Sequence, residues 1–191
     1  MHSNDYLEET IKIASLIDPE SIETMVKELV SLRERKGRLF IIGIGGSAAN
    51  ASHTVNDMRK LCGIEAYTPV DNVAELTARA NDEGWEIIFQ DGLKASNITV
   101  DDAVMVLSVG GGTEKVSLPI TNALRWLQRI GSVILGIVGP NGGLTKTYGK
   151  CVINIPLIEA KRITPHTEGW QSVILHCIVS HPDLQQRRTK W

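Results

Sequence analysis

The stretch RLFIIGIGGSAANASHTVNDMRK, residues 38–60, contains an apolar run, a glycine-rich turn and a helix-like segment in direct succession. The apolar run Phe40–Ile44 is continuous rather than alternating, which predicts a strand buried on both faces. The turn Gly43–Ser47 leads into residues 46–60, which we expect to be helical. Strand, glycine turn and helix in this order are typical of a βα unit in a parallel sheet.

The same pattern recurs along the chain. Three further apolar runs predict buried strands at Ala103–Val109, Val133–Val138 and Cys151–Ile155. Further helices are expected at 71–81, 84–96, 114–130 and 166–181. Alternating strands and helices predict right-handed crossovers and a parallel sheet between two helical layers. The predicted fold class is therefore a three-layer, doubly wound α/β sheet.

Two amphipathic segments, 5–16 and 20–35, precede this core and predict an N-terminal helix pair. The pair packs either on the sheet of its own chain or on a second subunit. A chain of 191 residues suits one domain. We expect this single domain to divide into the helix pair at 1–36, an α/β core at 37–181 and a polar tail at 182–191 that ends in Trp191.

Composition narrows the class of protein. The net charge of −2 and the lack of a long basic run argue against a nucleic-acid partner. No secretory signal is visible, and no apolar run approaches the ~18 residues of a membrane span, so we expect no membrane partner. The cysteines Cys62, Cys151 and Cys177 form no CxxC pair. They favour a reduced, cytoplasmic compartment and leave a catalytic cysteine as an alternative.

Two glycine-rich turns follow predicted strands at the same edge of the sheet. Gly45, Gly46 and Ser47 offer backbone N–H groups and a hydroxyl at the start of a helix, where an anion is stabilised. A plain tight turn is the alternative interpretation. Neither a GxGxxG fingerprint nor a GxxxxGK[ST] loop is present, so we expect no nucleotide cofactor.

The second turn places three consecutive glycines before a predicted helix, an arrangement that forms an anion-binding nest. Hydroxyls flank the glycines, and a flexible loop is the alternative interpretation. The candidate anion contacts in this turn are Ser108, Val109, Gly110 and Thr113. Two nests at neighbouring strand ends predict one anionic ligand that spans both.

Histidines and carboxylates recur on two predicted helices. His53 and Asp57 are four residues apart and share one helix face. On the last helix, Glu168 and His176 are roughly 80° apart around the axis, so they lie along one side. Zinc accepts these ligand types, while an exposed ion pair and a satisfied core histidine are the alternatives.

Asn81 and Asp82 form a polar turn between two predicted helices. Their side chains are suited to hydrogen bonds with sugar hydroxyls. An Asx turn combined with a helix cap explains them equally well.

Taken in order, these motifs resemble the SIS (sugar isomerase) domain family, and within it the phosphoheptose isomerases. The resemblance extends from the N-terminal helix pair to about residue 181. The motifs that carry it are the GxGGS turn at Gly43–Ser47, the HxxxE helix motif at His53–Asp57, the ND turn at Asn81–Asp82, the phosphate loop at Ser108–Thr113 and the last helix at Glu168–His176.

The chain departs from the family pattern at several positions. Asp57 stands where the family has its catalytic glutamate and is one methylene shorter. In the last helix, Glu168 and Gln171 replace a glutamine and a histidine, while His176 is kept. Further departures are Ile44 and Gly112 in place of asparagine, Gly110 in place of serine, and Gly169 in place of glutamate.

The resemblance implies the SIS fold and an aldose–ketose isomerase that acts through a cis-enediol. The implied reaction converts sedoheptulose 7-phosphate to D-glycero-D-manno-heptose 7-phosphate for heptose biosynthesis. A non-catalytic phosphosugar-binding or regulatory module, or an isomerase of another sugar phosphate, is the alternative. The resemblance also implies a homotetramer with active sites between subunits.

Some members of the family hold a divalent metal, typically zinc. The matching residues here are His53, Asp57, Glu168 and His176. Catalysis is expected from a carboxylate paired with His176; the family position makes Asp57 the base, and Glu168 is the alternative base with longer reach. The implied substrate contacts are Gly45, Gly46, Ser47, Asn81, Asp82, Ser108, Val109, Gly110, Thr113 and Glu168.

Overall fold

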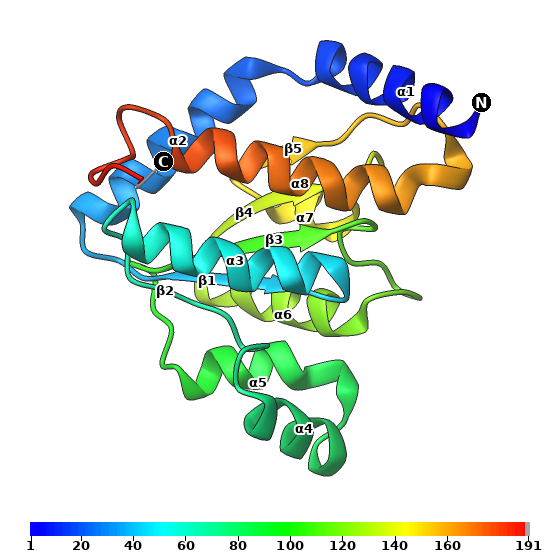
Figure 1. The fold of residues 1–191 in the computed structure, drawn as a ribbon. Helices are drawn as coiled ribbons and strands as arrows, with labels where there is room; N and C mark the ends of the chain where they lie inside the picture. Colours follow the sequence, from blue (N-terminus) through cyan, green and yellow to red (C-terminus); the bar gives the residue numbers. More distant parts are fainter. Residues whose placement is uncertain (190–191) are drawn as a thin grey trace.

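The predicted strands form the centre of the molecule. In the computed structural model, which describes residues 1–189, a parallel sheet has the order β2-β1-β3-β4-β5 (Figure 1). Its strands are β1 (Leu39–Gly43), β2 (Ala66–Tyr67), β3 (Ala103–Ser108), β4 (Val133–Val138) and β5 (Cys151–Asn154). The strand order reverses between β1 and β3, and ligands of open α/β sheets bind at such a switch point.

Alternate side chains of each strand enter two separate cores. Leu39 and Ile41 of β1 belong to one core, whereas Phe40 and Ile42 belong to the other. This period of two follows from the pleat of a strand. The sheet is therefore buried on both faces, as the continuous apolar runs predict.

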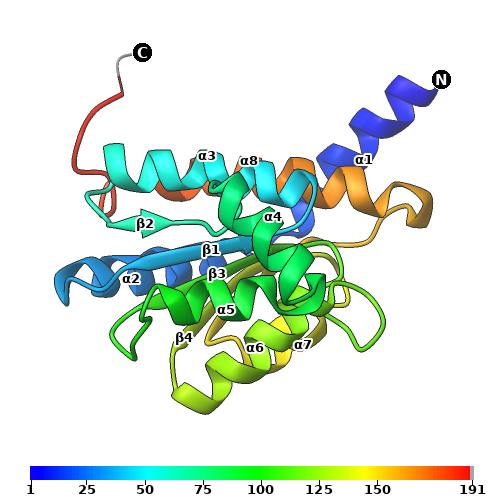
Figure 2. The same ribbon diagram turned by 90° about the horizontal axis from the view of Figure 1, so that it is seen from below.

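Helices cover both faces of the sheet (Figure 2). One face carries α2 (Pro19–Glu34), α3 (Gly46–Lys60) and α8 (Ile163–Val179). The other face carries α4 (Val73–Asp82), α5 (Ile88–Ala95), α6 (Leu118–Ile130) and α7 (Gly143–Tyr148). Short 3₁₀ turns precede α5 and α8, at Trp85–Ile87 and Ala160–Arg162. The three-layer, doubly wound class is thus confirmed.

Some helix bounds differ from the expected ones. The helix expected from residue 114 begins only at Leu118, because Ser117 adopts a left-handed φ of 62° just before it. Pro119 then lies in the first turn, where a missing N–H is tolerated. The last helix starts earlier than expected, at Ile163, and Pro165 likewise falls in its first turn.

Of the two packings considered for the N-terminal helix pair, the structure shows the one on its own chain, where both helices contribute to the core and the first helix adds the buried Ile13. Met25 and Leu29 of α2 are fully buried in the core of their own chain. The first helix, α1 (His2–Leu16), otherwise projects beyond the sheet (Figure 2). Its apolar side chains Leu7, Ile11 and Leu16 are at least 59% exposed.

The segment after α8 is anchored to the body of the domain. Leu184 is buried, and the Arg33 guanidinium donates to its carbonyl oxygen. The end of the expected polar tail, including Trp191, lies outside the described residues. Among residues 1–189, no helix is long and apolar enough to cross a membrane.

Candidate active site

A cavity of about 390 Å³ lies where β1 and β3 end. Its lining consists of Ile44, Ser47, Ser108, Val109, Gly110, Thr113, Val116, Ser117 and Thr164. The structure thus brings together most of the predicted anion contacts from both glycine-rich turns. Gly45 and Gly46 precede Ser47 in the first turn but do not line the cavity.

Ser47 has an unused hydroxyl in this cavity. The residue is 2% exposed, and its Oγ has no hydrogen-bond partner among the described residues. It lies in the first turn of α3, where backbone N–H groups also lack helical partners. Leaving a buried hydroxyl unpaired costs about 1–3 kcal/mol, and a ligand oxygen in the cavity would supply the partner.

Glycines allow the loop after β3 to pack closely on α7. Gly111 and Gly112 have φ of 68° and 81°, a region that favours glycine. Their carbonyl oxygens accept from the N–H groups of Thr145 and Leu144 at 3.0 and 2.9 Å. A Cβ on Gly111 would lie 2.0 Å from the carbonyl oxygen of Gly142. These hydrogen bonds hold the loop as a wall of the cavity.

The hydroxyls of this loop also shape it. Ser108 Oγ accepts from the Gly111 N–H at 3.0 Å, and Thr113 Oγ1 accepts from the Val116 N–H at 3.0 Å. Thr113 Oγ1 also donates to the Val116 carbonyl oxygen at 3.3 Å. The expectation that a helix starts directly after the glycines is wrong, because α6 begins only at Leu118. The loop therefore offers the Ser108 hydroxyl and main-chain N–H groups to an anion, without a helix N-terminus.

A second group of side chains gathers between α3 and α8. His53 Nε2 lies 3.2 Å and His176 Nδ1 lies 4.0 Å from the same Oδ2 atom of Asp57. The two imidazole rings meet edge to face with centroids 5.2 Å apart. One ligand atom from each of the three residues lies within 4.8 Å of the others, a donor set suited to a divalent metal.

Hydrogen bonds of two side-chain amides, one half-buried and one fully buried, set the register of α3 against α8. The Asn50 side chain donates to the Glu168 carbonyl oxygen at 2.9 Å and to Gln171 Oε1 at 3.2 Å. Gln171 is fully buried and donates to the carbonyl oxygen of Ile137 in β4 at 3.3 Å. This chain of amides fixes the helix that carries His176.

Glu168 lies apart from the His53–Asp57–His176 cluster. Its carboxylate lies over Gly46, where a Cβ would come within 2.4 Å of Glu168 Oε2. The N-terminus of α3, predicted to receive an anion, is thus covered by a carboxylate of the same chain. Of the four residues that the resemblance offers for a metal, the structure brings three together.

Asn81 and Asp82 lie at the exposed end of α4 and do not line the cavity. Asn81 Nδ2 donates to Asp82 Oδ1 at 2.7 Å. These side chains belong to the last turn of a helix rather than to a turn between two helices.

Sequence reasoning missed part of the cavity wall. Thr164 and Ser117 both line it, and each lies within two residues of a proline in the first turn of a helix. A polar residue at a helix start was the available signal, although it does not indicate which way the side chain points.

Two of the three cysteines are unsuited to a thiolate mechanism. All three are free, and burial raises the pKa of the Cys62 thiol to about 11. Burial also raises the pKa of Cys151. Cys62 therefore stays protonated at neutral pH and is a poor nucleophile.

Known proteins resemble this chain in sequence and in fold. Over 175 residues it is 30% identical to a phosphoheptose isomerase of Citrifermentans bemidjiense, covering 87% of this chain and 83% of that protein. The structure of a phosphoheptose isomerase from Neisseria gonorrhoeae superposes with a TM-score of 0.78 and 20% identity, covering 93% of this chain and 92% of the other. The structure of a phosphoheptose isomerase from Francisella tularensis superposes with a TM-score of 0.79 and 23% identity, covering 93% of this chain and 94% of the other. No protein-family profile matches the chain.

Proposed function

The chain belongs to the phosphoheptose isomerase family, and on that basis we propose that it converts sedoheptulose 7-phosphate to D-glycero-D-manno-heptose 7-phosphate for heptose biosynthesis. One observation carries the proposal: the cavity with the unpaired Ser47 hydroxyl and the His53–Asp57–His176 cluster both lie along α3. Ser47 and Asp57 are ten residues apart, about 15 Å along the helix axis. That separation suits an open-chain sugar phosphate with its phosphate at one end and its reacting carbons at the other.

The phosphate is proposed to occupy the cavity beside Ser47. Ser47 Oγ donates to it there, and Ser108, Val109, Gly110 and Thr113 form the opposite wall. No lysine or arginine lines the cavity among the described residues. Hydroxyls and main-chain N–H groups must therefore stabilise the charge. The N–H groups of the Gly45–Gly46 turn can contribute only once the Glu168 carboxylate leaves Gly46. Binding energy at this end positions the distant carbons.

The isomerisation moves a proton between C1 and C2. A base removes a proton from C1 while an acid gives one to the oxygen on C2, which forms the cis-enediol. Return of a proton to C2 and loss of one from the C1 hydroxyl complete the aldose. We assign Asp57 as the base, because its Oδ2 lies beside both His53 and His176, and His176 as the group that serves the oxygens. Glu168 is the alternative base, but its carboxylate must first leave Gly46.

The same cluster fits a divalent metal, with zinc favoured. Two imidazoles and a carboxylate are ligands that zinc accepts at ~2.0–2.2 Å. Bound there, zinc would supply Lewis-acid polarisation of the substrate oxygens. Glu168 is proposed as a further ligand, which requires its side chain to turn from Gly46 towards His176.

A homotetramer with active sites between subunits is part of the proposal. The exposed apolar side chains Leu7, Ile11 and Leu16 of α1 support subunit contact. Asn81 and Asp82 are exposed at the end of α4, and they are proposed to contact the substrate of a neighbouring subunit. Sedimentation velocity tests this, and a wild-type protein that stays monomeric at micromolar concentration would contradict it. A cytoplasmic location is proposed from the free cysteines.

The activity test is a panel of pentose, hexose and heptose phosphates followed by ¹H NMR in D₂O. Sedoheptulose 7-phosphate should be converted, with deuterium entering at the carbon that exchanges its proton. A chelator should abolish conversion if the metal is required, and added zinc should restore it. Turnover of another sugar phosphate alone would contradict the proposed substrate while leaving the reaction class intact.

A further inference from the structure

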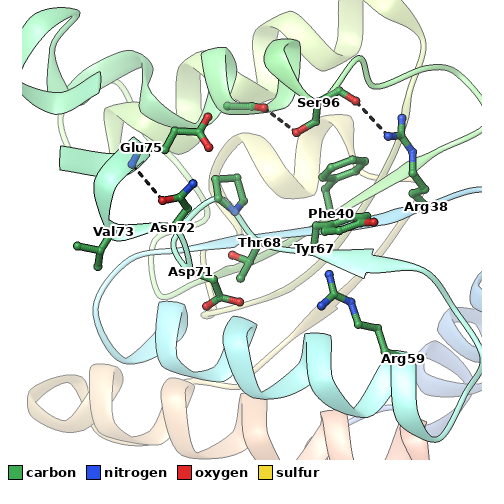
Figure 3. Close-up of a pocket in the computed structure, with 12 residues that line it drawn as sticks. Arg38, Phe40, Arg59, Tyr67, Thr68, Asp71, Asn72, Val73, Glu75 and Ser96 are labelled. Atoms are coloured by element: carbon green, nitrogen blue, oxygen red, sulfur yellow. Dashed lines mark hydrogen bonds between the residues drawn. The ribbon is translucent and has the colours of Figure 1, made fainter. Parts of the chain in front are cut away.

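A second, larger cavity of about 610 Å³ lies at the β2 edge of the sheet (Figure 3) and shares no lining residue with the candidate active site. We call it the β2-edge cavity. It is lined by Arg38, Phe40, Arg59, Tyr67, Thr68, Pro69, Asp71, Asn72, Val73, Glu75, Gly92 and Ser96. Its volume is that of an ordinary small-molecule site, about 300–1,000 Å³. None of these residues takes part in the proposed isomerisation.

One wall of the β2-edge cavity is a column of two stacked aromatic rings with a guanidinium group at each end (Figure 3). The Arg38 guanidinium lies 5.1 Å from the Phe40 ring centroid, and the Phe40 and Tyr67 rings stack at 5.8 Å. The Arg59 guanidinium ends the column, 4.6 Å from the Tyr67 ring. Because both ring faces are used inside the column, the cavity meets ring edges, which are electropositive.

The two arginines differ in their partners. Arg38 is ion-paired with Asp102 at 2.8 Å and also donates to the carbonyl oxygens of Ser96 and Asn97. Arg59 contacts the Tyr67 ring but has no carboxylate or carbonyl partner among residues 1–189. Arg59 therefore brings an uncompensated positive charge and a fork of unused N–H donors to the rim.

The carboxylates of the β2-edge cavity are already engaged. Glu75 is paired with Arg79 at 3.0 Å, and Asp71 accepts a hydrogen bond from the Ser52 hydroxyl. Figure 3 shows Asp71 and Arg59 at separate parts of the rim, and no ion pair joins them. The carboxylates thus leave Arg59 available to a ligand.

Neutral donors complete the β2-edge cavity. Thr68 is 8% exposed, and its hydroxyl has no partner in the described part of the chain. The side-chain oxygen of Asn72 accepts from the Glu75 N–H at 3.2 Å as the cap of α4, which leaves its NH₂ group as a donor. A buried hydroxyl without a partner is costly, and a ligand oxygen would remove that cost.

We propose that the β2-edge cavity binds a small ligand with an oxyanion group, a phosphate ester or a carboxylate, through Arg59. The planar guanidinium fork matches both anions, and hydrogen bonds to charged groups are the strong ones. Thr68 and Asn72 orient the remainder of the ligand. Arg59 belongs to α3, and Ser52 ties Asp71 to the same helix, so the occupant contacts the helix that carries His53 and Asp57.

The test uses ¹⁹F NMR of protein labelled with 3-fluorotyrosine. The chain has three tyrosines, so Tyr67 gives one of three signals and is assigned with Tyr67→Phe. Inorganic phosphate and malonate are titrated separately, which distinguishes phosphate from carboxylate chemistry. The Tyr67 signal should move saturably with at least one of them. No movement with either probe, up to the phosphate concentration that saturates the candidate active site, would overturn the proposal.

Matched variants give the specificity control. Arg59→Gln should weaken the Tyr67 titration by roughly ten- to a hundredfold, the scale of hydrogen bonds to a charged group. Arg129→Gln removes the same charge from an exposed position on α6 and should leave the titration unchanged.

The signals of Tyr6 and Tyr148 report whether each variant is folded. If Arg59→Gln is unfolded, Arg59→Lys, which keeps the charge but loses the fork, should show intermediate weakening. An unaltered titration in the folded Arg59 variant would refute the site whatever the isomerase assay shows.

Discussion

The Ser47 hydroxyl has no partner among the described residues, so its removal breaks no hydrogen bond within the described chain. Ser47→Ala is expected to change the free energy of unfolding by no more than about 0.5 kcal/mol. It should raise the KM for the sugar phosphate roughly tenfold, because a hydrogen bond to a charged group is lost. The kcat should change little if the contact is equal in the ground and transition states. Steady-state kinetics measure KM and kcat, and urea unfolding measures the free energy of unfolding. Ser15→Ala, on the exposed face of α1, is the control.

Asp57 and Glu168 are the two candidate bases, and their carboxylates lie in different places: Asp57 in the cluster with the two histidines, Glu168 over Gly46. Asp57→Asn keeps the shape of the side chain but removes the proton acceptor, so kcat should fall by roughly 10²- to 10⁴-fold. Glu168→Gln should have a mild effect, because Glu168 lies on Gly46 rather than in the cluster and because glutamine keeps an oxygen that can still bind a metal. Asp101→Asn, an exposed carboxylate, is the matched control.

Bound metal is measured in the same variants. If both substitutions abolish activity and both lose metal, the two carboxylates act as ligands rather than as a base. Full activity in both single variants would contradict a mechanism in which a carboxylate is the base.

At the scale of elements, a buried ion cluster joins α1 to the start of α8. Glu9 accepts from Arg162 Nε and contacts His166 Nε2, each at 2.8 Å, and Tyr6 stacks on the His166 ring. Hydrogen bonds from Arg162 and His166 lower the pKa of Glu9 from 4.5 to about 2. This cluster fixes the inner part of a helix that buries Ile13 but exposes Leu7, Ile11 and Leu16.

The Glu9 cluster makes the attachment of α1 sensitive to pH, because the attachment weakens in acid. Because the pKa of Glu9 is lower in the folded state, its stabilising effect is complete above about pH 4.5 and is lost as the pH falls towards about 2. The difference in unfolding free energy between wild type and Glu9→Gln should therefore shrink over that range. Urea unfolding at a series of pH values measures it, with exposed Glu8→Gln as control. A difference independent of pH would show that Glu9 stabilises by packing alone.

Some elements were predictable from sequence because one local signal determines them. The runs that became β1 and β3 are apolar without interruption, since both faces of the sheet are covered. In contrast, β2 is a two-residue edge strand, and the register Leu39↔Ala66 defines it rather than any local pattern. The late start of α6 depends on the left-handed backbone of Ser117, a conformation that serine seldom adopts.

The candidate site was predictable in its residue types but only partly in its geometry. Spacing placed His53 and Asp57 on one face, and the structure shows them 3.2 Å apart. Spacing also placed Glu168 on the same side of the helix as His176. It does not determine the side-chain rotamer, so it could not show where the Glu168 carboxylate points. The absence of a side chain at Gly46 leaves room for the Glu168 carboxylate there. The β2-edge cavity could not be foreseen, because it joins segments that are distant in sequence.

At the scale of the whole molecule, the strand order has a consequence for how fast the domain forms. The register Leu135↔Cys151 joins residues 16 apart (151 − 135), whereas Leu39↔Ala103 joins residues 64 apart (103 − 39). Closing a longer loop costs more chain entropy, and sheets built from distant pairings fold slowly. During refolding, pulse-labelled hydrogen exchange should therefore protect the amides of β4 and β5 before those of β1. Simultaneous protection of all strands would argue against this order. β1 leads directly into Ser47 and α3. A chain diluted from denaturant should therefore become compact before it recovers catalytic activity.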